Sequence, residues 1–397
     1  MAPTAPRRRI DVAERRARLA TRHHLAAPVP DVPTAAADLV GLHSSDPVSV
    51  YLSAWSRVEG FEVADLEEAL YERRSLVRLL GMRRTMFVVP RELAAVIDAA
   101  CTRALAPAER RRLLKLIGDQ GIDPHPDRWL SRVMQRTLSA LGERGQATAK
   151  ELAAAVPELT ARLSFGEGRT WAGTVGLSTR LLFLLATEAR IVRGRPRGTW
   201  ISSQYRWAAT ADWLDGGLPA LEPEEARTEL VRRWLTAFGP GTLTDLAWWT
   251  GWSQRQTRRA LAAAGAVEVE LEAGTGYVLA EDLEPVAQPD GWVALLPALD
   301  PTVMGWKERS WYLGDHQELL FDRNGNAGPT VWADGRIVGG WAQRADGTIA
   351  VELLDPVLPS IQGSIAAEAE RLRAWLAGTV ITPRFRTPLE KRLTSTP

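Results

Sequence analysis

The sequence predicts a mainly helical α+β protein in which three tandem winged-helix units precede a small antiparallel β-barrel. Two patterns lead to this fold class. A set of amphipathic helices followed by a β-hairpin recurs three times between residues 10 and 285. Beyond residue 286, short apolar segments are separated by the regularly spaced turn pairs Asp334-Gly335 and Asp346-Gly347, which is typical of antiparallel strands.

The first unit is expected over residues 10–90, after a short disordered basic arm at residues 1–9. Its apolar spacing predicts helices at 11–22, 34–42, 47–58 and 64–73, and strands at 76–79 and 84–89. Three arginines on this hairpin are candidate DNA contacts, because guanidinium groups pair with phosphates: Arg78, Arg83 and Arg84.

The second unit is expected over residues 91–210 and begins with a long helical region. Further helices are predicted at 127–141, from 146 onward and at 174–188, and strands at 191–193 and 199–201. Thr148 and Glu151 form a capping box at the start of one helix. Arg195 and Arg197 lie in the glycine-rich tip of the hairpin and are candidate phosphate contacts.

The third unit is expected over residues 211–285, with helices at 224–238, 241–249 and 253–264 and strands at 267–271 and 276–279. The third helix of a winged helix usually enters the major groove of DNA. Gln254, Arg255 and Arg258 on this helix combine base-reading with phosphate-reading side chains. A solvated helix face explains these three residues equally well.

Residues 286–397 are expected to form the barrel, a helix and a basic tail. Strands are predicted at 292–297, 330–333, 336–341 and 348–353, the helix at 365–377, and the tail beyond 383.

The composition excludes several other classes of protein. The 397 residues are 45% hydrophobic and 24% charged, as in ordinary globular proteins. The single Cys101 excludes an internal disulfide and a cysteine-based zinc site, and the five histidines lack metal-ligand spacing, so we expect no metal and no other cofactor. Without a signal peptide or an apolar run of about 18 residues, we expect a cytoplasmic, nucleoid-associated protein and no membrane contact.

The charge balance gives little indication of nucleic-acid binding by itself. The chain has 49 basic and 48 acidic residues, so its net charge is only +1. Nearly all basic residues are arginines, which suit phosphates and base edges, but GC-rich coding produces the same bias. Only local clusters of arginine can therefore indicate a DNA-binding surface.

Three polar side chains meet at the junction between two predicted helices of the first unit. His43, Ser45 and Asp46 lie where an apolar helix surface would not require them. A histidine two residues from a serine can orient a water or act as base beside a nucleophile. Asp46 followed by Pro47 also reads as a helix N-cap with proline at the first helical position, so a purely structural role stays open.

Six segments in chain order resemble the AlkZ-type (YcaQ-like) winged-helix DNA glycosylases of bacteria. They are LVGLHSSDP at 39–47, RRTMFVVP at 83–90, PRGTW at 196–200, DPTVMGWKERS at 300–310, FDRNGN at 321–326 and DGRIVGGW at 334–341. The resemblance covers residues 10 to 390. Lys307, Arg309 and Arg336 lie in these segments and are further candidate DNA contacts.

The resemblance implies a C-shaped monomer around damaged duplex DNA and a monofunctional glycosylase for N7-alkylated purines, including bulky or crosslinked adducts. Some members of the family protect producers of DNA-alkylating natural products. The family's catalytic motif has Gln, an apolar residue, then Gln or Asp, whereas this sequence has His43 and Ser45 at the two polar positions. We expect His43 to position or activate the attacking water, Ser45 to assist, and Asp46 to orient His43 or to stabilise the developing cation.

The shorter Ser45 leaves room for a large lesion, so a bulky N7-guanine adduct of a genotoxic natural product is the preferred substrate. Two other functions remain open. A transcriptional regulator would bind undamaged duplex in a sequence-specific way, typically as a symmetric dimer. A catalytically inactive member of the family would bind adducts without releasing a base.

Overall fold

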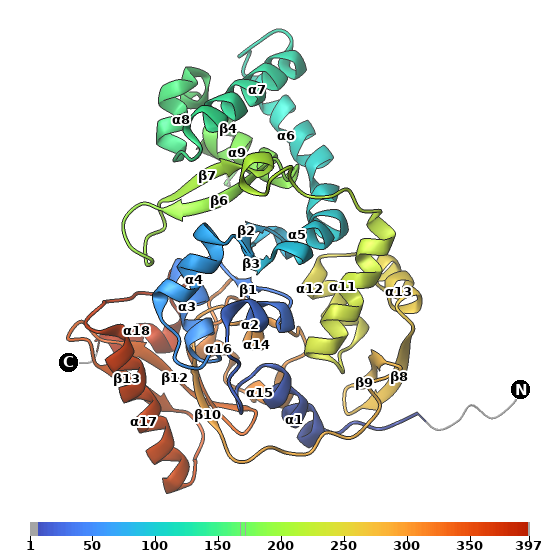
Figure 1. The fold of residues 1–397 in the computed structure, drawn as a ribbon, viewed down its shortest axis with the longest axis vertical. Coiled ribbons are helices and arrows are strands. Elements are labelled where there is room, and N and C mark those ends of the chain that lie inside the picture. The colour runs from blue at the N-terminus through green and yellow to red at the C-terminus, as the bar shows by residue number, and fades with distance from the viewer. Residues whose placement is uncertain (1–6, 167, 171, 396–397) are drawn as a thin grey trace, which may run out of the picture.

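The computed structural model describes residues 7–166, 168–170 and 172–395 as a mixed α/β fold of helices and small antiparallel sheets (Figure 1). The first part contains α1 (Val12–Arg22), α2 (Val32–Asp38), β1 (Leu42–His43), α3 (Pro47–Trp55), α4 (Val63–Glu67), β2 (Leu76–Leu80) and β3 (Met86–Pro90). The helix expected to reach residue 42 ends at Asp38. Val40 and Gly41 then adopt positive φ angles of 54° and 110°, which turn the chain into a short strand that the sequence did not predict.

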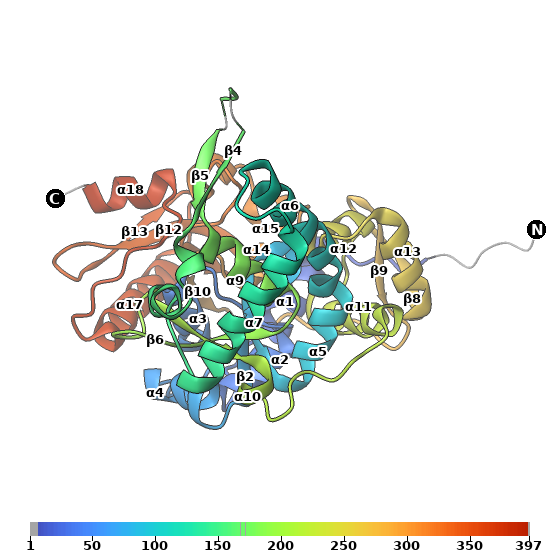
Figure 2. The same cartoon turned by 90° about the horizontal axis from the view of Figure 1, so that it is seen from above.

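The second part contains a long helical region and two hairpins. Its elements are α5 (Arg91–Ile97), α6 (Ala106–Asp119), α7 (Pro126–Arg144), α8 (Ala149–Ala155), β4 (Arg162–Phe165), β5 (Gly173–Gly176), α9 (Leu177–Thr187), β6 (Ile191–Pro196), β7 (Tyr205–Ala209) and α10 (Thr210–Trp213). The predicted capping box is confirmed, since the amide of Glu151 donates to Oγ1 of Thr148 at 3.2 Å. The expected strand at 199–201 is wrong, because the partner of β6 is β7. The projecting β4–β5 hairpin was not predicted (Figure 2).

The third part agrees with the predicted elements. It contains α11 (Pro223–Phe238), α12 (Leu243–Thr250), α13 (Gln254–Ala263), β8 (Ala266–Leu271) and β9 (Gly274–Leu279). The end of the expected disordered arm is instead paired with β8: the amide of Glu270 donates to the carbonyl of Arg8 at 2.8 Å, and the amide of Ile10 donates to the carbonyl of Glu270 at 3.0 Å. Residues 1–6 of that arm lie outside the described residues.

The C-terminal part forms an open sheet, so the predicted β-barrel is wrong. Its strands are β10 (Val293–Leu296), β11 (Thr330–Ala333), β12 (Arg336–Gln343) and β13 (Ile349–Leu353), hydrogen-bonded in that order. Its helices are α14 (Pro301–Met304), α15 (Ser310–Leu313), α16 (Gln317–Leu320), α17 (Pro359–Leu376) and α18 (Pro388–Ser395). In the described residues β10 and β13 are the two edges and do not pair; α17 packs against β10, and α18 packs against β12.

The β2–β3 hairpin of the first part and the β6–β7 hairpin of the second part do not form separate sheets. They join in one five-stranded sheet with the order β1-β3-β2-β6-β7. The link is the pairing of Arg78 on β2 with Arg193 on β6. Both hairpins therefore contribute to one sheet that joins the first and second parts of the chain.

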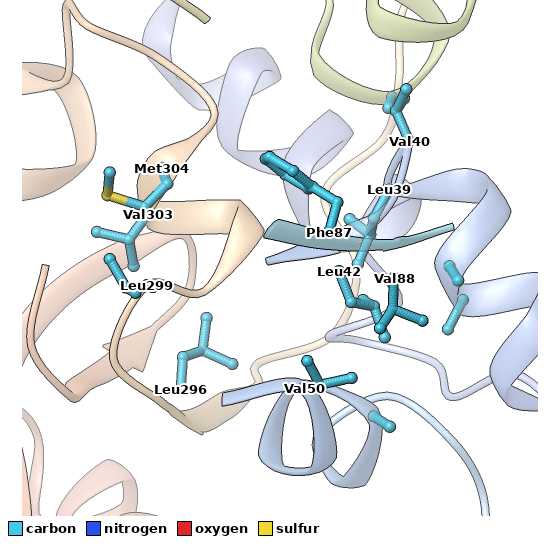
Figure 3. Close-up of a cluster of buried hydrophobic side chains, with 14 of the residues drawn as sticks. Leu39, Val40, Leu42, Val50, Phe87, Val88, Leu296, Leu299, Val303 and Met304 are labelled. Carbon is cyan, nitrogen blue, oxygen red and sulfur yellow. The ribbon is translucent and has the colours of Figure 1, made fainter. Parts of the chain in front are cut away.

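Two large hydrophobic cores hold these parts together. One core joins the first part, α5, α11–α13 and the C-terminal sheet, and a second core lies mainly within the second part and includes Leu80 of β2. Figure 3 shows the first core where Leu42 and Val88 face Val50 on one side and the 296–304 segment on the other. The junction that follows β1 is thus anchored on residues far away in the sequence.

Candidate functional site

The junction at residues 43–46 lies between a strand and the start of a helix. β1 pairs with β3, with His43 opposite Phe87, and the amide of Ser44 donates to the carbonyl of Met86 at 2.7 Å. Gly41 permits this close pairing: a Cβ there would lie 2.7 Å from Cγ1 of Val89, and its φ of +110° is one that L-residues rarely adopt. The pairing of β1 with β3 therefore fixes the backbone position of His43.

His43 is only 4% exposed, and its ring meets the edge of Phe87 with 5.0 Å between ring centroids. Its Nδ1 accepts a long hydrogen bond of 3.5 Å from the amide of Ser45. An accepting Nδ1 carries no proton, which places the proton of a neutral ring on Nε2. Nε2 has no hydrogen-bond partner in the described part of the chain, so it is available to a bound molecule.

His43 is uncharged at neutral pH. Burial lowers its pKa to about 3, and the nearby positive charge of Arg83 lowers it further in the same direction. A ring with so low a pKa holds an added proton weakly. The arrangement therefore suits hydrogen bonding to a water better than removal of its proton.

Ser45 and Asp46 are held by backbone amides. Oγ of Ser45 accepts from the amide of Met86 at 3.3 Å. Asp46 is the N-cap of α3, as its position before Pro47 predicted: one carboxylate oxygen accepts from the amide of Val48 at 3.2 Å and the other from the amide of Arg384 at 2.8 Å. Burial raises the pKa of Asp46, and these two amide hydrogen bonds oppose that shift. The hydrogen bonds of Asp46 do not include His43, so the expectation that Asp46 orients that ring is wrong.

An aromatic-cationic cluster lies on one flank of the junction. Two guanidinium groups lie over the ring of Trp248 on α12. The guanidinium carbon of Arg83 is 3.9 Å from the ring centroid, and that of Arg309 is 5.2 Å from it. Arg83 and Arg84 have positive φ angles of 50° and 63°, which form the tight turn between β2 and β3. The turn thus packs against α12, and Arg83 lies near His43.

A second cluster of arginines lies on the other flank. Arg384 donates from its side chain to the carbonyl of Ser45 at 3.3 Å. Arg193 stacks on Trp207 at 3.7 Å, and burial lowers its pKa to about 10, with Arg78 and Arg384 acting in the same direction. Neither Arg193 nor Arg384 forms an ion pair with a described carboxylate. Neither Arg193 nor Arg384 was among the expected DNA contacts, because their approach to the junction depends on contacts between distant segments.

Four of the expected DNA-binding arginines are buried or paired with other side chains of the protein. Arg78 is only 1% exposed and lies against the ring of Tyr205 at 4.6 Å, so its guanidinium is not presented to solvent. The other three form ion pairs: Arg84 with Glu109 at 2.7 Å, Arg195 with Glu67 at 2.6 Å and Glu72 at 2.8 Å, and Arg197 with Glu151. A phosphate contact by any of these four would have to compete with these interactions within the protein, and their role in DNA binding stays a prediction.

The remaining expected contacts are better placed for a partner. Within the described residues they are polar or cationic side chains that form no ion pair, all of them exposed except the half-buried Arg309: Gln254, Arg255, Arg258, Lys307, Arg309 and Arg336. Arg255 and Arg258 share α13 with Arg259, which lies 3.4 Å from Glu224.

The described residues contain no group of three or more side chains arranged to hold a metal ion. None of their helices is long and apolar enough to cross a membrane.

Comparison with known proteins places this site in a family. The family described as DNA glycosylase AlkZ-like matches residues 36–375, which include the whole junction. The chain belongs to this family. The resemblance found in the sequence is thereby confirmed. Arg384 lies outside the matched range of the AlkZ-like family.

A comparison of sequence and a comparison of structure, both with AlkZ of Streptomyces sahachiroi, give further support. The interstrand DNA cross-link repair glycosylase of Streptomyces sahachiroi is 30% identical over 140 residues, which are 33% of this chain and 37% of that relative. The matched stretch thus spans little more than a third of the curated AlkZ-like relative. The solved structure of Streptomyces sahachiroi DNA glycosylase AlkZ covers 92% of this chain and 97% of its own, with a TM-score of 0.68 and 20% identity, which shows a shared fold.

Proposed function

We propose that this chain is a monofunctional DNA glycosylase that hydrolyses the N-glycosidic bond of N7-alkylated purines in duplex DNA. The observation that carries the proposal is the junction itself, in a chain of the AlkZ-like family. There an uncharged His43 with a free Nε2 lies beside Ser45, between two arginine clusters that lack carboxylate partners.

The chemistry needs little acid catalysis. Alkylation at N7 makes the purine a cation, so the C1′–N9 bond breaks with its electron pair going to the base, which leaves neutral. The oxygen of a water bonds to C1′ as positive charge develops on the sugar, and the water proton passes to solvent. The protein must therefore hold the adduct and place the water.

The geometry favours His43 as a positioning donor. Nε2–H donates to the oxygen of the attacking water, as the amide of the family's usual glutamine can, and Oγ of Ser45 provides a second polar contact. The buried carboxylate of Asp46, three residues away, adds negative charge near the developing cation. Both the positioning of the water and the negative charge of Asp46 would act in the step in which the C1′–N9 bond breaks.

We propose a bulky N7-guanine adduct of a genotoxic natural product as the lesion, and self-resistance of a producing organism as the context. The cross-link repair glycosylase among the relatives supports a large lesion rather than a methyl group. Ser45 in place of a longer side chain leaves space beside His43.

We also propose that three winged-helix units at 10–90, 91–210 and 211–285, with the C-terminal part at 286–397, surround the duplex as a C-shaped monomer. The exposed cations of α13 would then contact the DNA in the third unit. The half-buried Arg309 beside Trp248 and the half-buried Arg193 beside Trp207 would contact phosphates near the lesion.

Neutralising α13 is expected to weaken DNA binding in a salt-dependent way. The variants Arg255→Gln and Arg258→Gln should each reduce the slope of log Kobs against log salt concentration by about one unit, since each removes about one phosphate contact. Arg259→Gln is the matched control, because Arg259 already has Glu224 as a neighbour at 3.4 Å. Fluorescence anisotropy with an undamaged duplex measures the slopes. Unchanged slopes in both variants would remove α13 from the interface.

The rate of base release is expected to be independent of pH from about pH 5 to about pH 8. The pKa of His43 is lowered to about 3, so its ring is neutral over this whole pH range. The neutral form is lost only when the pH falls through about 3. Single-turnover rates, corrected for spontaneous depurination at each pH, measure this. A rate that rises with a midpoint near the ordinary histidine pKa would contradict a neutral, buried His43.

The proposal is tested with a duplex that carries one bulky N7-guanine adduct. Release of the modified base, identified by its mass, together with one alkali-labile site at the lesion, is the expected outcome. Tight binding without release would instead indicate an inactive adduct-binding protein. Sequence-specific binding to undamaged duplex without release would indicate a transcriptional regulator.

A further inference from the structure

A short N-terminal segment, residues 7–10, pairs with the outer edge of β8 in the β8–β9 hairpin (Figure 1). The amide of Glu270 donates to the carbonyl of Arg8 at 2.8 Å, and the amide of Ile10 donates to the carbonyl of Glu270 at 3.0 Å. This parallel register places Arg9 beside Glu270. Ile10 is fully buried and packs with apolar residues of the hairpin: Val269, Leu271 and Val278. The N-terminal segment is therefore held against β8, and the pairing sets the direction of its side chains.

The register puts two cations of this segment beside two carboxylates of β8. Successive side chains of paired strands lie on opposite faces of a sheet, so Arg7 and Arg9 share the outer face with Glu268 and Glu270. All four residues are exposed. Arg7 forms an ion pair with Glu268. Arg9 forms no ion pair with a carboxylate of the described residues, so its guanidinium is available to a partner.

The outer face of the hairpin continues to α13. Tyr277 on β9 lies directly opposite Glu268 on β8, and α13 packs against β8. Burial raises the pKa of the Tyr277 hydroxyl and the charge of Glu268 adds to this shift, while the charges of Arg258 and Arg7 oppose it. The exposed Arg258 of α13 and Arg7 of the N-terminal segment therefore border the same patch of surface.

The N-terminal segment changes the sign of the charge on this patch. Without the segment, the two carboxylates of Glu268 and Glu270 outweigh Arg258, and phosphates within the Debye length of about 10 Å would be repelled. Arg7 and Arg9 add two positive charges on the same face. The charge of these five side chains is then positive, which favours an approaching phosphate backbone.

We propose that the N-terminal segment makes the outer face of the β8–β9 hairpin a second contact surface for the phosphates of duplex DNA, beside α13. Arg9 pairs with a phosphate through its forked guanidinium donors, and Arg7 cancels the charge of Glu268 so that the backbone can approach. The inference rests on the DNA contact proposed for α13 and not on the chemistry at His43.

Fluorescence anisotropy with an undamaged duplex tests the contact of Arg9. We expect Arg9→Gln to weaken binding by about three- to tenfold at about 50 mM salt and to lower the slope of log Kobs against log salt concentration by about one unit. Arg8→Gln is the matched control, because it removes the same charge from the other face, where Arg8 is paired with Glu14 at 2.8 Å. This control should bind within about twofold of the wild type, with an unchanged slope.

A double variant tests the role of Arg7. Arg7→Gln should weaken binding by about three- to tenfold at about 50 mM salt, because Glu268 loses its partner and repels the phosphates. Adding Glu268→Gln to this variant should restore the affinity to within about twofold of the wild type, because no charge is then left uncompensated at this pair. A double variant that stays as weak as Arg7→Gln would overturn the role assigned to Arg7.

The remaining outcomes separate this inference from the glycosylase function. Wild-type affinity and slope in Arg9→Gln would overturn the inference and leave the N-terminal segment a purely structural role. An equal loss in Arg8→Gln would also overturn it, since the net charge alone would then explain the effect. A wild-type protein that shows the expected differences in binding but releases no base would refute the glycosylase function and support this contact surface.

Discussion

Replacing His43 by alanine is expected to slow base release by about 100-fold, at the lower end of what a positioned hydrogen-bonding group contributes to such a step. The ring is buried, uncharged and pinned between Phe87 and the amide of Ser45, so its removal leaves the water without its fixed donor. Single-turnover release from an N7-guanine adduct, with enzyme in excess, measures the effect. Equal rates in the variant and the wild type would place the chemistry elsewhere in the molecule.

Two further variants separate chemistry from folding. His43→Gln should retain a rate within about tenfold of the wild type, because the amide supplies a donor without titrating. His125→Ala is the matched control, since His125 is exposed and its side chain caps no helix. DNA affinity should be unchanged in all three proteins, and a loss of affinity parallel to the loss of rate in His43→Ala would argue against a role in the chemical step.

Removing the side chain of Arg57 is expected to lower the free energy of unfolding by about 3–5 kcal/mol, the usual cost of breaking one side of a buried ion pair. Arg57 near the end of α3 and Asp300 before α14 are both fully buried, and two guanidinium nitrogens donate to the two carboxylate oxygens at 2.9 and 2.6 Å. Asp300 also accepts from the hydroxyl of Ser53 at 2.7 Å. The network joins the helix that begins at the junction to the C-terminal part.

Urea denaturation of Arg57→Ala measures this change, and Asp300→Asn should give a loss of similar size. Arg233→Ala removes an exposed ion pair with Glu229 on α11 and serves as the control, with an expected loss below about 1 kcal/mol. A loss in Arg57→Ala no larger than in this control would show that the buried network does not hold the two parts together.

Local signals in the sequence predicted most elements correctly. Ser253 caps α13 by accepting from the amide of Gln256 at 3.3 Å, and Asp334-Gly335 forms the turn between β11 and β12 with φ angles of 47° and 80°. Both features depend on residues close together in the chain, so composition and spacing reveal them. Closure of the C-terminal sheet depends on pairing of its two edge strands, about which spacing within each strand says nothing. That prediction failed for this reason.

In the candidate site, too, local features were predicted and contacts between distant segments were not. The polar junction was visible in the sequence, because His43, Ser45 and Asp46 fall within four residues that have an apolar context on both sides. The ion pair of Arg195 with Glu67 joins residues 128 positions apart, and no local pattern could predict it. Arg384 approaches Ser45 across an even longer separation. Which arginines have a partner within the protein therefore depends on how distant segments of the chain pack against one another.

The most direct test of the central claim is the fate of the base itself. Wild-type protein in excess is incubated with a duplex that carries one bulky N7-guanine adduct, and the released base is quantified by mass spectrometry against a protein-free sample. The account predicts stoichiometric release of the intact modified base and a strand that breaks only after treatment with alkali. Release no faster than spontaneous depurination, with the adduct still bound, would contradict it.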